Sequence, residues 1–250
     1  MQWTDDGIII GTRRYGETSL IVEVMTAAHG RHLGLVRGGR SRRHKPVLQP
    51  GNSVIATWRA RLDAHLGTFT IEPTAQRAAR LMDSPAGLYA IQVLGGLTRL
   101  LPERDPHPQI HDVLAAIIDW LDDPLAGGAL VVRFELRMLE ELGFGLDLDQ
   151  CAATGTTDDL AYVSPKSGRA VSRSAAEPWR DKMLPLPAFL LAPGEAPPAD
   201  DLIAAFRLTE FFLARHVYEP RGLTPPDERA RLIALIGRQA SAAQPKASAL

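Results

Sequence analysis

The first 76 residues of the chain consist of short apolar runs separated by turns, and this pattern constrains the fold more than any other feature. Turns that contain glycine, such as Arg14-Tyr15-Gly16 and Ala28-His29-Gly30, separate the first three runs. Five runs in all have the length and composition of strands, over residues 7–10, 20–25, 32–36, 53–58 and 66–71. Because five such strands are too few to form two broad sheets, we expect a small closed barrel.

The periodicity of the apolar residues changes at Asp83-Ser84-Pro85, where serine can cap a helix and proline can open it. The spacing beyond this point predicts helices over residues 86–101, 110–122, 128–142, 200–218 and 226–237. Two of the intervening stretches, 145–173 and the proline-rich 185–198, predict irregular structure. We therefore expect an α+β chain with a barrel domain over 1–80, a helical domain over 81–240 and a disordered tail over 241–250.

The charge is divided unevenly between these two parts, although the net charge of the whole chain is only -1. Residues 1–80 carry 12 Lys+Arg against 6 Asp+Glu, whereas residues 81–250 carry 16 against 23. Arginine supplies most of the N-terminal excess, and its guanidinium group binds phosphate bidentately and stacks on bases. This excess favours a polyanionic partner for the barrel, although the same composition also fits a solvated surface.

The most informative local feature is the basic run over residues 37–45, RGGRSRRHK, which has five Lys+Arg in nine residues and two glycines that let the backbone approach a ligand. Tyr15 and Trp58 are candidate platforms for base stacking, although Trp58 is equally suited to fill the barrel core. We expect a surface that binds phosphates without base preference. Its candidate residues are Arg13, Arg14, Tyr15, Arg31, Arg37, Arg40, Arg42, Arg43, Lys45, Trp58, Arg59 and Arg61.

The usual catalytic motifs are absent: the sequence has no Gly-x4-Gly-Lys-Ser/Thr loop, no Gly-x-Ser-x-Gly and no His-Glu-x-x-His. His107 and His111 have a spacing that could serve a metal, but Pro108 leaves His107 outside a regular helical turn, which favours exposed or capping histidines. Glu140 and Glu141 diverge by about 100° on a helix and cannot act as a pair. We expect no catalytic residues and no cofactor. The alternative is a nucleic-acid-processing enzyme or an RNA-binding subunit whose catalytic groups are unrecognised.

The single cysteine, Cys151, cannot form an internal disulfide and fits a reducing compartment. No apolar run reaches the roughly 18 to 20 residues that would cross a bilayer, and the first residues lack the pattern of a targeting segment. The sequence therefore predicts a cytoplasmic protein with no membrane partner.

Four segments of the chain resemble the RecO family of recombination mediators. They are residues 6–20 (DGIIIGTRRYGETSL), 26–31 (TAAHGR), 36–40 (VRGGR) and 133–144 (RFELRMLEELGF), the last running on to Asp149-Gln150-Cys151. The resemblance implies an oligonucleotide-binding (OB) type of barrel and a mediator that is not an enzyme. It also implies a nucleoid-associated protein that binds single- and double-stranded DNA, anneals complementary strands, and works with RecR to load RecA on DNA coated by single-strand binding protein.

The resemblance also implies a zinc knuckle near residues 145–175, and here the sequence departs from the pattern. Family members that bind zinc carry two cysteine pairs, but the first pair is reduced here to Cys151-Ala152-Ala153-Thr154. The second is missing, since residues 162–171 contain neither cysteine nor histidine. Because a structural zinc ion needs about four nitrogen or sulfur ligands, we expect a degenerate knuckle without metal.

The resemblance further implies that the helical domain binds the acidic C-terminal tail of single-strand binding protein, which ends in phenylalanine. Such a tail requires an apolar groove with a cation at its edge. In the helix expected over 128–142, Arg133 and Arg137 share one face because they are four residues apart, and Leu136 can line an adjacent groove with Val132 and Leu139. The alternative is that both arginines only pair with Glu140, Glu141 or neighbouring helices.

Overall fold

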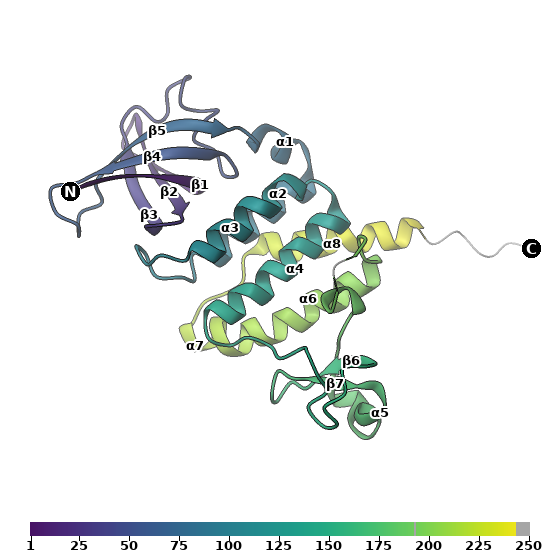
Figure 1. Ribbon diagram of the computed structural model, residues 1–250. Helices are drawn as coiled ribbons and strands as arrows, with labels where there is room; N and C mark the ends of the chain where they lie inside the picture. The colour runs from purple at the N-terminus through teal and green to yellow at the C-terminus, as the bar shows by residue number, and fades with distance from the viewer. Residues whose placement is uncertain (193, 244–250) are drawn as a thin grey trace, which may run out of the picture. The chain divides into compact units, whose positions relative to one another are not determined.

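The computed structural model describes residues 1–192 and 194–243, and the chain divides into two compact units, residues 1–123 and 124–250 (Figure 1). Strands give way to helices near residue 77, close to the position expected from the sequence. The boundary between the compact units lies further along the chain, after residue 123, because the first three helices pack with the barrel. The boundary at residue 80 therefore separates two kinds of secondary structure but lies inside the first compact unit.

The expected five strands form a closed barrel in the order β1-β2-β3-β5-β4. Neighbouring strands are antiparallel except β3 and β5, which pair in parallel at one position, Leu35 with Thr68. This sparse pairing forms the seam of the barrel. The strand bounds are β1 Gln2–Tyr15, β2 Ser19–Thr26, β3 Gly30–Val36, β4 Ser53–Arg59 and β5 Thr68–Ala75.

Strand β1 is much longer than the apolar run that predicted it, because it has two different partners. Its first half, from Gln2 to Ile8, pairs with β4, and its second half, from Gly7 to Tyr15, pairs with β2. A bulge between Ile9 and Gly11 lies in the second half, where bulges re-aim side chains. The charged ends of β1 lack alternating apolar residues, so no sequence pattern predicted them.

The barrel core consists of alternating inward side chains, among them Ile9, Val22, Val24 and Val54, with Trp58 at its centre. Leu48, in the loop that joins β3 to β4, is 1% exposed and packs in the same core. A buried anchor in this loop fixes the chain on either side of it.

Three helices complete the first unit: α1 Ala78–Asp83, α2 Pro85–Thr98 and α3 Pro108–Ile117, followed by a short 3-10 turn over Ile118–Trp120. The hydroxyl of Ser84 accepts a hydrogen bond from the amide of Gly87 at 3.3 Å and so caps α2. Helices α2 and α3 pack against β1, and α2 approaches it closely, since a Cβ on Gly95 would lie 2.7 Å from the carbonyl oxygen of Ile10.

In the second unit, α4 (Pro124–Glu141), α6 (Ala199–Leu213) and α8 (Asp227–Ala243) pack against one another. A π-helical turn over Ala214–Tyr218 and the short α7 (Glu219–Arg221) lead from α6 toward α8. Buried Phe134, Phe206 and Phe212 occupy the bundle core. The helix that ends the described chain reaches residue 243, so residues 241–243 are helical and not disordered as expected; residues 244–250 lie outside the described residues.

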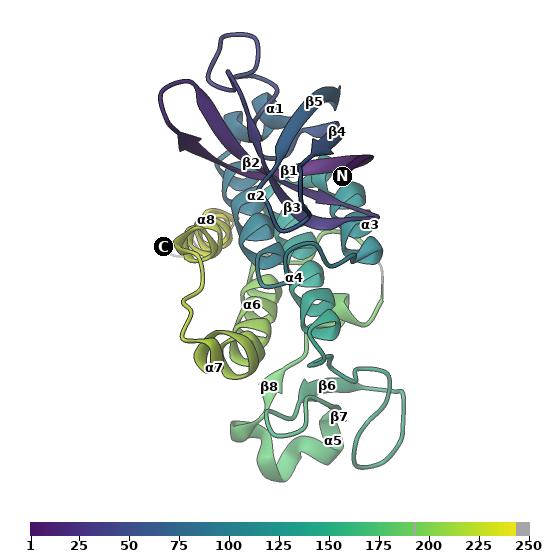
Figure 2. The same cartoon turned by 90° about the vertical axis from the view of Figure 1, so that its left-hand side faces the viewer.

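The two stretches expected to be irregular, together with the segment between them, contain a small three-stranded sheet in the order β7-β6-β8, at one end of α4 and α6 (Figure 2). The strands are β6 Leu160–Val163, β7 Ala170–Ser172 and β8 Leu184–Pro185, with α5 (Arg173–Ala176) and 3-10 turns over Glu177–Lys182 and Ala188–Leu190. Strands of two to four residues are too short for a periodic signal, which is why the sequence did not predict them.

Within the described residues, no helix has the length and hydropathy to cross a membrane.

Candidate nucleic-acid interface

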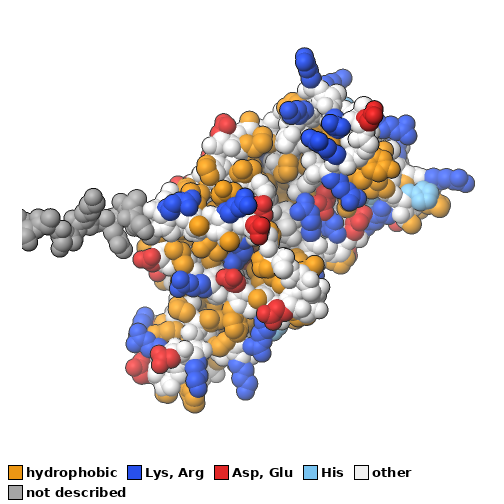
Figure 3. All heavy atoms as spheres, turned by 180° about the vertical axis from the view of Figure 1, so that it is seen from behind, with side chains coloured by type: hydrophobic (Ala, Val, Ile, Leu, Met, Phe, Trp, Pro, Cys, Tyr) orange, Lys and Arg blue, Asp and Glu red, His pale blue; other side chains and the backbone are white. Residues whose placement is uncertain are grey.

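Four of the expected cations line one groove beside the hairpin of β1 and β2, here called the hairpin groove. Arg13 and Arg14 come from β1, and Arg40 and Lys45 come from the basic loop over residues 37–45. All four side chains are exposed. The groove has a volume of about 400 Å³ and no carboxylate among its lining residues. Figure 3 shows one face of the molecule on which lysine and arginine side chains gather over the barrel.

The basic loop is held in a fixed conformation on both sides of this groove. The amide of Arg40 donates to the carbonyl of Thr18 at 3.0 Å, and the Arg40 guanidinium donates to the carbonyl of Glu17, so the loop is tied to the β1–β2 turn. Gly38 has a φ of 65°, a left-handed conformation that glycine adopts without strain. The amide of Leu48 donates to the carbonyl of His44 at 2.9 Å, and this helical turn ends at Leu48, the buried residue of the loop.

Two further cations of the loop, Arg37 and Arg43, line a second groove together with His44. This groove, here called the seam groove, lies along the sparsely paired β3 and β5 and has a volume of about 620 Å³. Its other lining residues come from β3 and β5: Leu35, Val36, Thr68, Phe69, Thr70, Ile71 and Glu72. Arg42 is exposed and lines neither groove.

Arg31 lies against Glu23 and lines neither groove. Its guanidinium donates to the Glu23 carboxylate at 2.7 Å and to the carbonyl of Leu101 at 3.3 Å. Arg99, at the end of α2, donates to the other carboxylate oxygen of Glu23 at 2.7 Å. Glu23 thus pairs with both arginines, leaves the cluster with one net positive charge, and joins β2, β3 and the end of α2.

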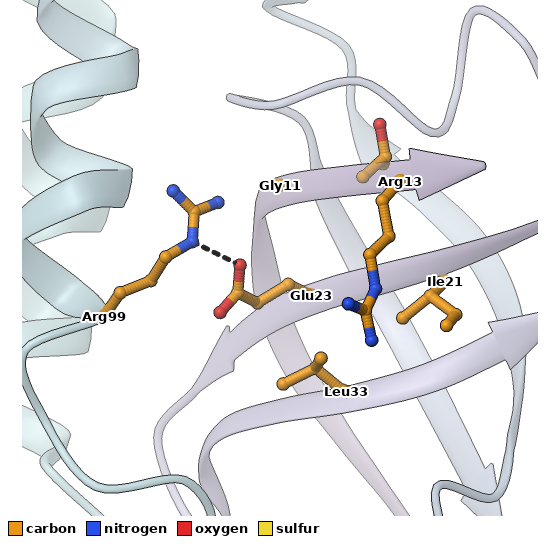
Figure 4. A pocket seen from close by; sticks show the side chains of 7 residues that line it. Gly11, Arg13, Ile21, Glu23, Leu33 and Arg99 are labelled. Atoms are coloured by element: carbon orange, nitrogen blue, oxygen red, sulfur yellow. Dashed lines mark hydrogen bonds and ion pairs between the residues drawn. The ribbon is translucent and has the colours of Figure 1, made fainter. Parts of the chain in front are cut away.

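This ion cluster borders a pocket of about 340 Å³ on the outer face of β1, β2 and β3 (Figure 4). Arg13 lies over the other end of the pocket, beside Ile21 and Leu33. A Cβ on Gly11 would collide with a guanidinium nitrogen of Arg99, so a larger residue here would require the end of the Arg99 side chain to shift. No sequence pattern pointed to Arg99, because it lies outside the barrel segment and only the packing of α2 brings it to the sheet.

Trp58 does not serve as a stacking platform, because it is 0% exposed and its indole Nε1 donates to the carbonyl of Leu66 at 2.9 Å. The core alternative was the correct one: alternation along β4 points Trp58 inward. Tyr15, in contrast, is 54% exposed at the end of β1. Arg59 and Arg61 are exposed at and beyond the end of β4 and line neither groove.

In the second unit, Arg133, Leu136 and Arg137 line one groove of about 480 Å³. Its other lining residues are Gly145, three leucines and two carboxylates: Leu146, Leu148, Leu190, Glu140 and Asp147. Val132 and Leu139 are fully buried and do not line it, contrary to expectation. Leu146 and Leu148 follow α4, and Leu190 ends the 3-10 turn over Ala188–Leu190, so no periodicity in the sequence connected these leucines to Arg133.

Both arginines of this groove have partners. The Arg133 guanidinium donates to the carbonyls of Phe189 and, at 3.1 Å, Ala192. Arg137 pairs with Glu140 at 2.6 Å and with Glu141 at 3.4 Å, as the alternative interpretation expected. A carboxylate ligand in the groove would therefore compete with a surface ion pair at Arg137 and with two neutral acceptors at Arg133.

The knuckle residues do not fit a zinc ion. Within the described residues, no group of three or more histidine, cysteine or acidic side chains could hold a metal. Cys151 is buried, and its sulfur accepts a hydrogen bond from the amide of Ser172 at 3.3 Å. Burial raises the pKa of this thiol, but hydrogen bonds from Ser172 and Thr154 outweigh that effect and lower the pKa to about 6.

The two histidines weighed as metal ligands also have other roles. His107 is the N-cap of α3 and lies 3.4 Å from the carboxylate of Asp105, and His111 lies 3.1 Å from that of Asp112. His107 thus stands outside the helix, as the position of Pro108 predicted.

The closed barrel and the helices that follow it define an α+β protein with an N-terminal OB-type domain. Residues 1–77 match the model of the family described as "Recombination protein O N terminal", and residues 84–224 match "Recombination protein O C terminal". The chain belongs to the RecO family of DNA repair proteins.

Relatives named DNA repair protein RecO are similar over nearly the full length of the chain. The protein from Brucella abortus is 59% identical over 245 residues, covering 98% of this chain and 99% of its own. The protein from Chelativorans is 60% identical over 239 residues, covering 95% and 96%. The protein from Rhizobium etli is 64% identical over 224 residues, covering 89% and 88%.

Proposed function

We propose that this protein is a recombination mediator that binds single- and double-stranded DNA through the basic surface of its barrel and anneals complementary strands. With RecR, it helps to load RecA on DNA coated by single-strand binding protein, at the nucleoid in the cytoplasm. It needs no cofactor and has no catalytic residues. The hairpin groove carries the proposal, because four exposed cations around one groove neutralise phosphates without reading bases.

The test is the salt dependence of binding to single-stranded DNA. Arg14→Ala with Lys45→Ala removes two exposed cations that have no ion-pair partner in the described structure. Affinity should fall, and the slope of log affinity against log salt should decrease by about 1 for each cation. Arg180→Ala, an exposed cation of the second unit, serves as the control and should leave both values unchanged. An unchanged slope in the double variant would place the DNA elsewhere.

Annealing gives a second readout that separates a mediator from an enzyme. Charge neutralisation requires neither nucleotide nor metal, so complementary strands should anneal in buffer that contains a chelator and no ATP. A requirement for either component would favour the alternative, an OB-fold enzyme of nucleic-acid processing.

We further propose that the groove of the second unit receives the acidic tail of single-strand binding protein. Leu136, Leu146, Leu148 and Leu190 give an apolar floor for its terminal phenylalanine, and Arg133 lies at the edge. A tail peptide should bind with a Kd in the micromolar range, which corresponds to a binding free energy of about -8 kcal/mol. Arg133→Ala should reduce this affinity by about tenfold.

Three variants separate the possible locations of the tail. Arg137→Ala should have a smaller effect than Arg133→Ala, because Arg137 already pairs with two carboxylates. If the double barrel variant weakens the peptide and neither groove variant does, the tail binds the barrel and this assignment is wrong.

A further inference from the structure

We propose that the barrel holds two nucleic-acid strands at once, one in the hairpin groove and one in the seam groove, with the basic loop between them. This inference rests on the proposed function and adds to it a second strand site. In the sequence the loop is one basic run, but in the structure its cations line two separate grooves.

The two grooves have no lining residue in common. Arg40 and Lys45 face β1 and β2, whereas Arg37, Arg43 and His44 face β3 and β5. Within the described residues, Arg37, Arg43 and Lys45 form no ion pair, so their charges are available to a ligand. A single strand following one groove would leave the cations of the other unused.

Hydrogen bonds within the loop, and one from Gln49 just after it, hold the loop between the grooves in one conformation. The imidazole Nδ1 of His44 lies 3.1 Å from the carbonyl of Gly38 and 3.2 Å from the hydroxyl of Ser41. Gln49 donates to the carbonyl of Lys45 at 2.8 Å, and the buried Leu48 anchors the loop in the barrel. The separation of the two sets of cations therefore exists before any ligand binds, and little conformational entropy is lost on binding.

The seam groove has the composition of a site for a whole nucleotide strand. Arg37 and Arg43 supply charge for phosphates, and the half-buried Leu35 and Ile71 supply an apolar floor for sugars and bases. Its one carboxylate, Glu72, lies in β5. The hairpin groove holds four cations and no carboxylate, so it should bind its strand more tightly.

Holding two strands on either side of one cationic loop reduces the repulsion between their phosphates. The loop places positive charge between two polyanions, where it acts on both at once. The arrangement gives a physical basis for bringing complementary strands together without an energy source.

The experiment counts strands per chain. Oligothymidylate of about six nucleotides is short enough to occupy one groove, and titration calorimetry of the full chain should give two bound per chain. Arg37→Glu with Arg43→Glu should reduce the count to one and keep the tighter event. Arg14→Glu with Lys45→Glu should also reduce it to one and keep the weaker event. Arg180→Glu is the matched control and should leave two.

Both pairs of substitutions are at exposed positions, and unchanged melting temperatures would show that the variants fold. Each pair should also slow annealing by about tenfold or more. One strand per wild-type chain, with that same event weakened by both pairs, would overturn the inference in favour of a single continuous path. So would a seam variant that still binds two strands, which would leave the seam groove to another ligand such as an acidic peptide. Failure of the wild-type protein to bind any strand would instead contradict the proposed function itself.

Discussion

At the scale of single residues, the two aromatic candidates of the barrel have opposite roles, which a pair of truncations should reveal. Trp58→Ala should destabilise the protein by about 3–5 kcal/mol, because it removes a fully buried side chain from the barrel core. Tyr15→Ala should change stability by less than about 0.5 kcal/mol and weaken binding of single-stranded DNA, because an exposed ring can stack on a base. Urea unfolding and DNA titration measure the two effects. The reverse pattern would place Trp58 at the interface.

His32 should make the barrel sensitive to acid. It is 2% exposed among Trp3, Trp58 and Phe69, and neither ring nitrogen has a hydrogen-bond partner in the described structure. Burial and the nearby Arg104 and His29 lower its pKa from the ordinary 6.5 to about 4. Because the folded pKa lies below the unfolded one, stability is complete above pH 6.5 and falls as the pH decreases toward 4.

Thermal melting between pH 7.5 and about 4.5 tests this effect. His32→Gln removes the titrating group, so its melting temperature should fall less with acid than that of the wild type. His65→Gln is the control, an exposed histidine of the same barrel, and should keep the wild-type slope. Equal slopes for all three proteins would show that His32 does not carry the effect.

At the scale of elements, a buried ion pair joins α8 to the rest of the second unit. The Arg229 guanidinium donates to both carboxylate oxygens of Glu135 at 2.7 and 3.1 Å and to the carbonyl of Phe206 at 2.7 Å. Thr209 donates its hydroxyl to the same carboxylate. Glu135 and Arg229 are 0% and 4% exposed, so neither has water as a substitute partner.

Loss of one partner should therefore be costly. Arg229→Ala should destabilise the protein by about 3–5 kcal/mol and increase proteolysis near α8, because it leaves the Glu135 carboxylate buried without its cation. Arg231→Ala, at an exposed position of the same helix, should have little effect. Replacing both partners, with Glu135→Leu and Arg229→Met, should recover much of the loss. Equal stability of the two single variants would show that the pair does not anchor α8.

At the scale of the whole molecule, we predict that the protein contains no stoichiometric zinc and that chelation leaves its melting temperature unchanged. Backbone hydrogen bonds hold the knuckle: the amide of Ala152 donates to the carbonyl of Ala170 at 2.8 Å, and the amide of Cys151 donates to the carbonyl of Thr156 at 2.7 Å. Metal analysis that finds one zinc per chain, with a lower melting temperature after chelation, would contradict this. Cys151→Ser is an informative companion, because the serine hydroxyl can still accept a hydrogen bond from the Ser172 amide but would remove a thiolate ligand from zinc; only a small change in melting temperature is expected.

The sequence by itself determined that a barrel precedes the helices and that the barrel segment is basic. Alternating apolar residues over the first 76 positions and helical spacing after Ser84 are local signals, since side chains repeat every two residues in a strand and every 3.6 in a helix. The arginine-rich N-terminal segment and the single cysteine are likewise properties of composition. These features predicted the barrel, the helices and a basic surface.

Only the tertiary structure decided which cations remain available. Arg31 is paired with Glu23, and Arg99, 76 positions from Glu23, completes that cluster through the packing of α2. For Arg133 the sequence left open a place at the edge of a groove or pairing with neighbouring residues; in the structure it lines the groove and donates to carbonyls in the segment before α6. The division of one basic run between two grooves depends on where Leu48 anchors the loop. Contacts between residues far apart in sequence leave no trace in local periodicity, because they arise from how the elements pack.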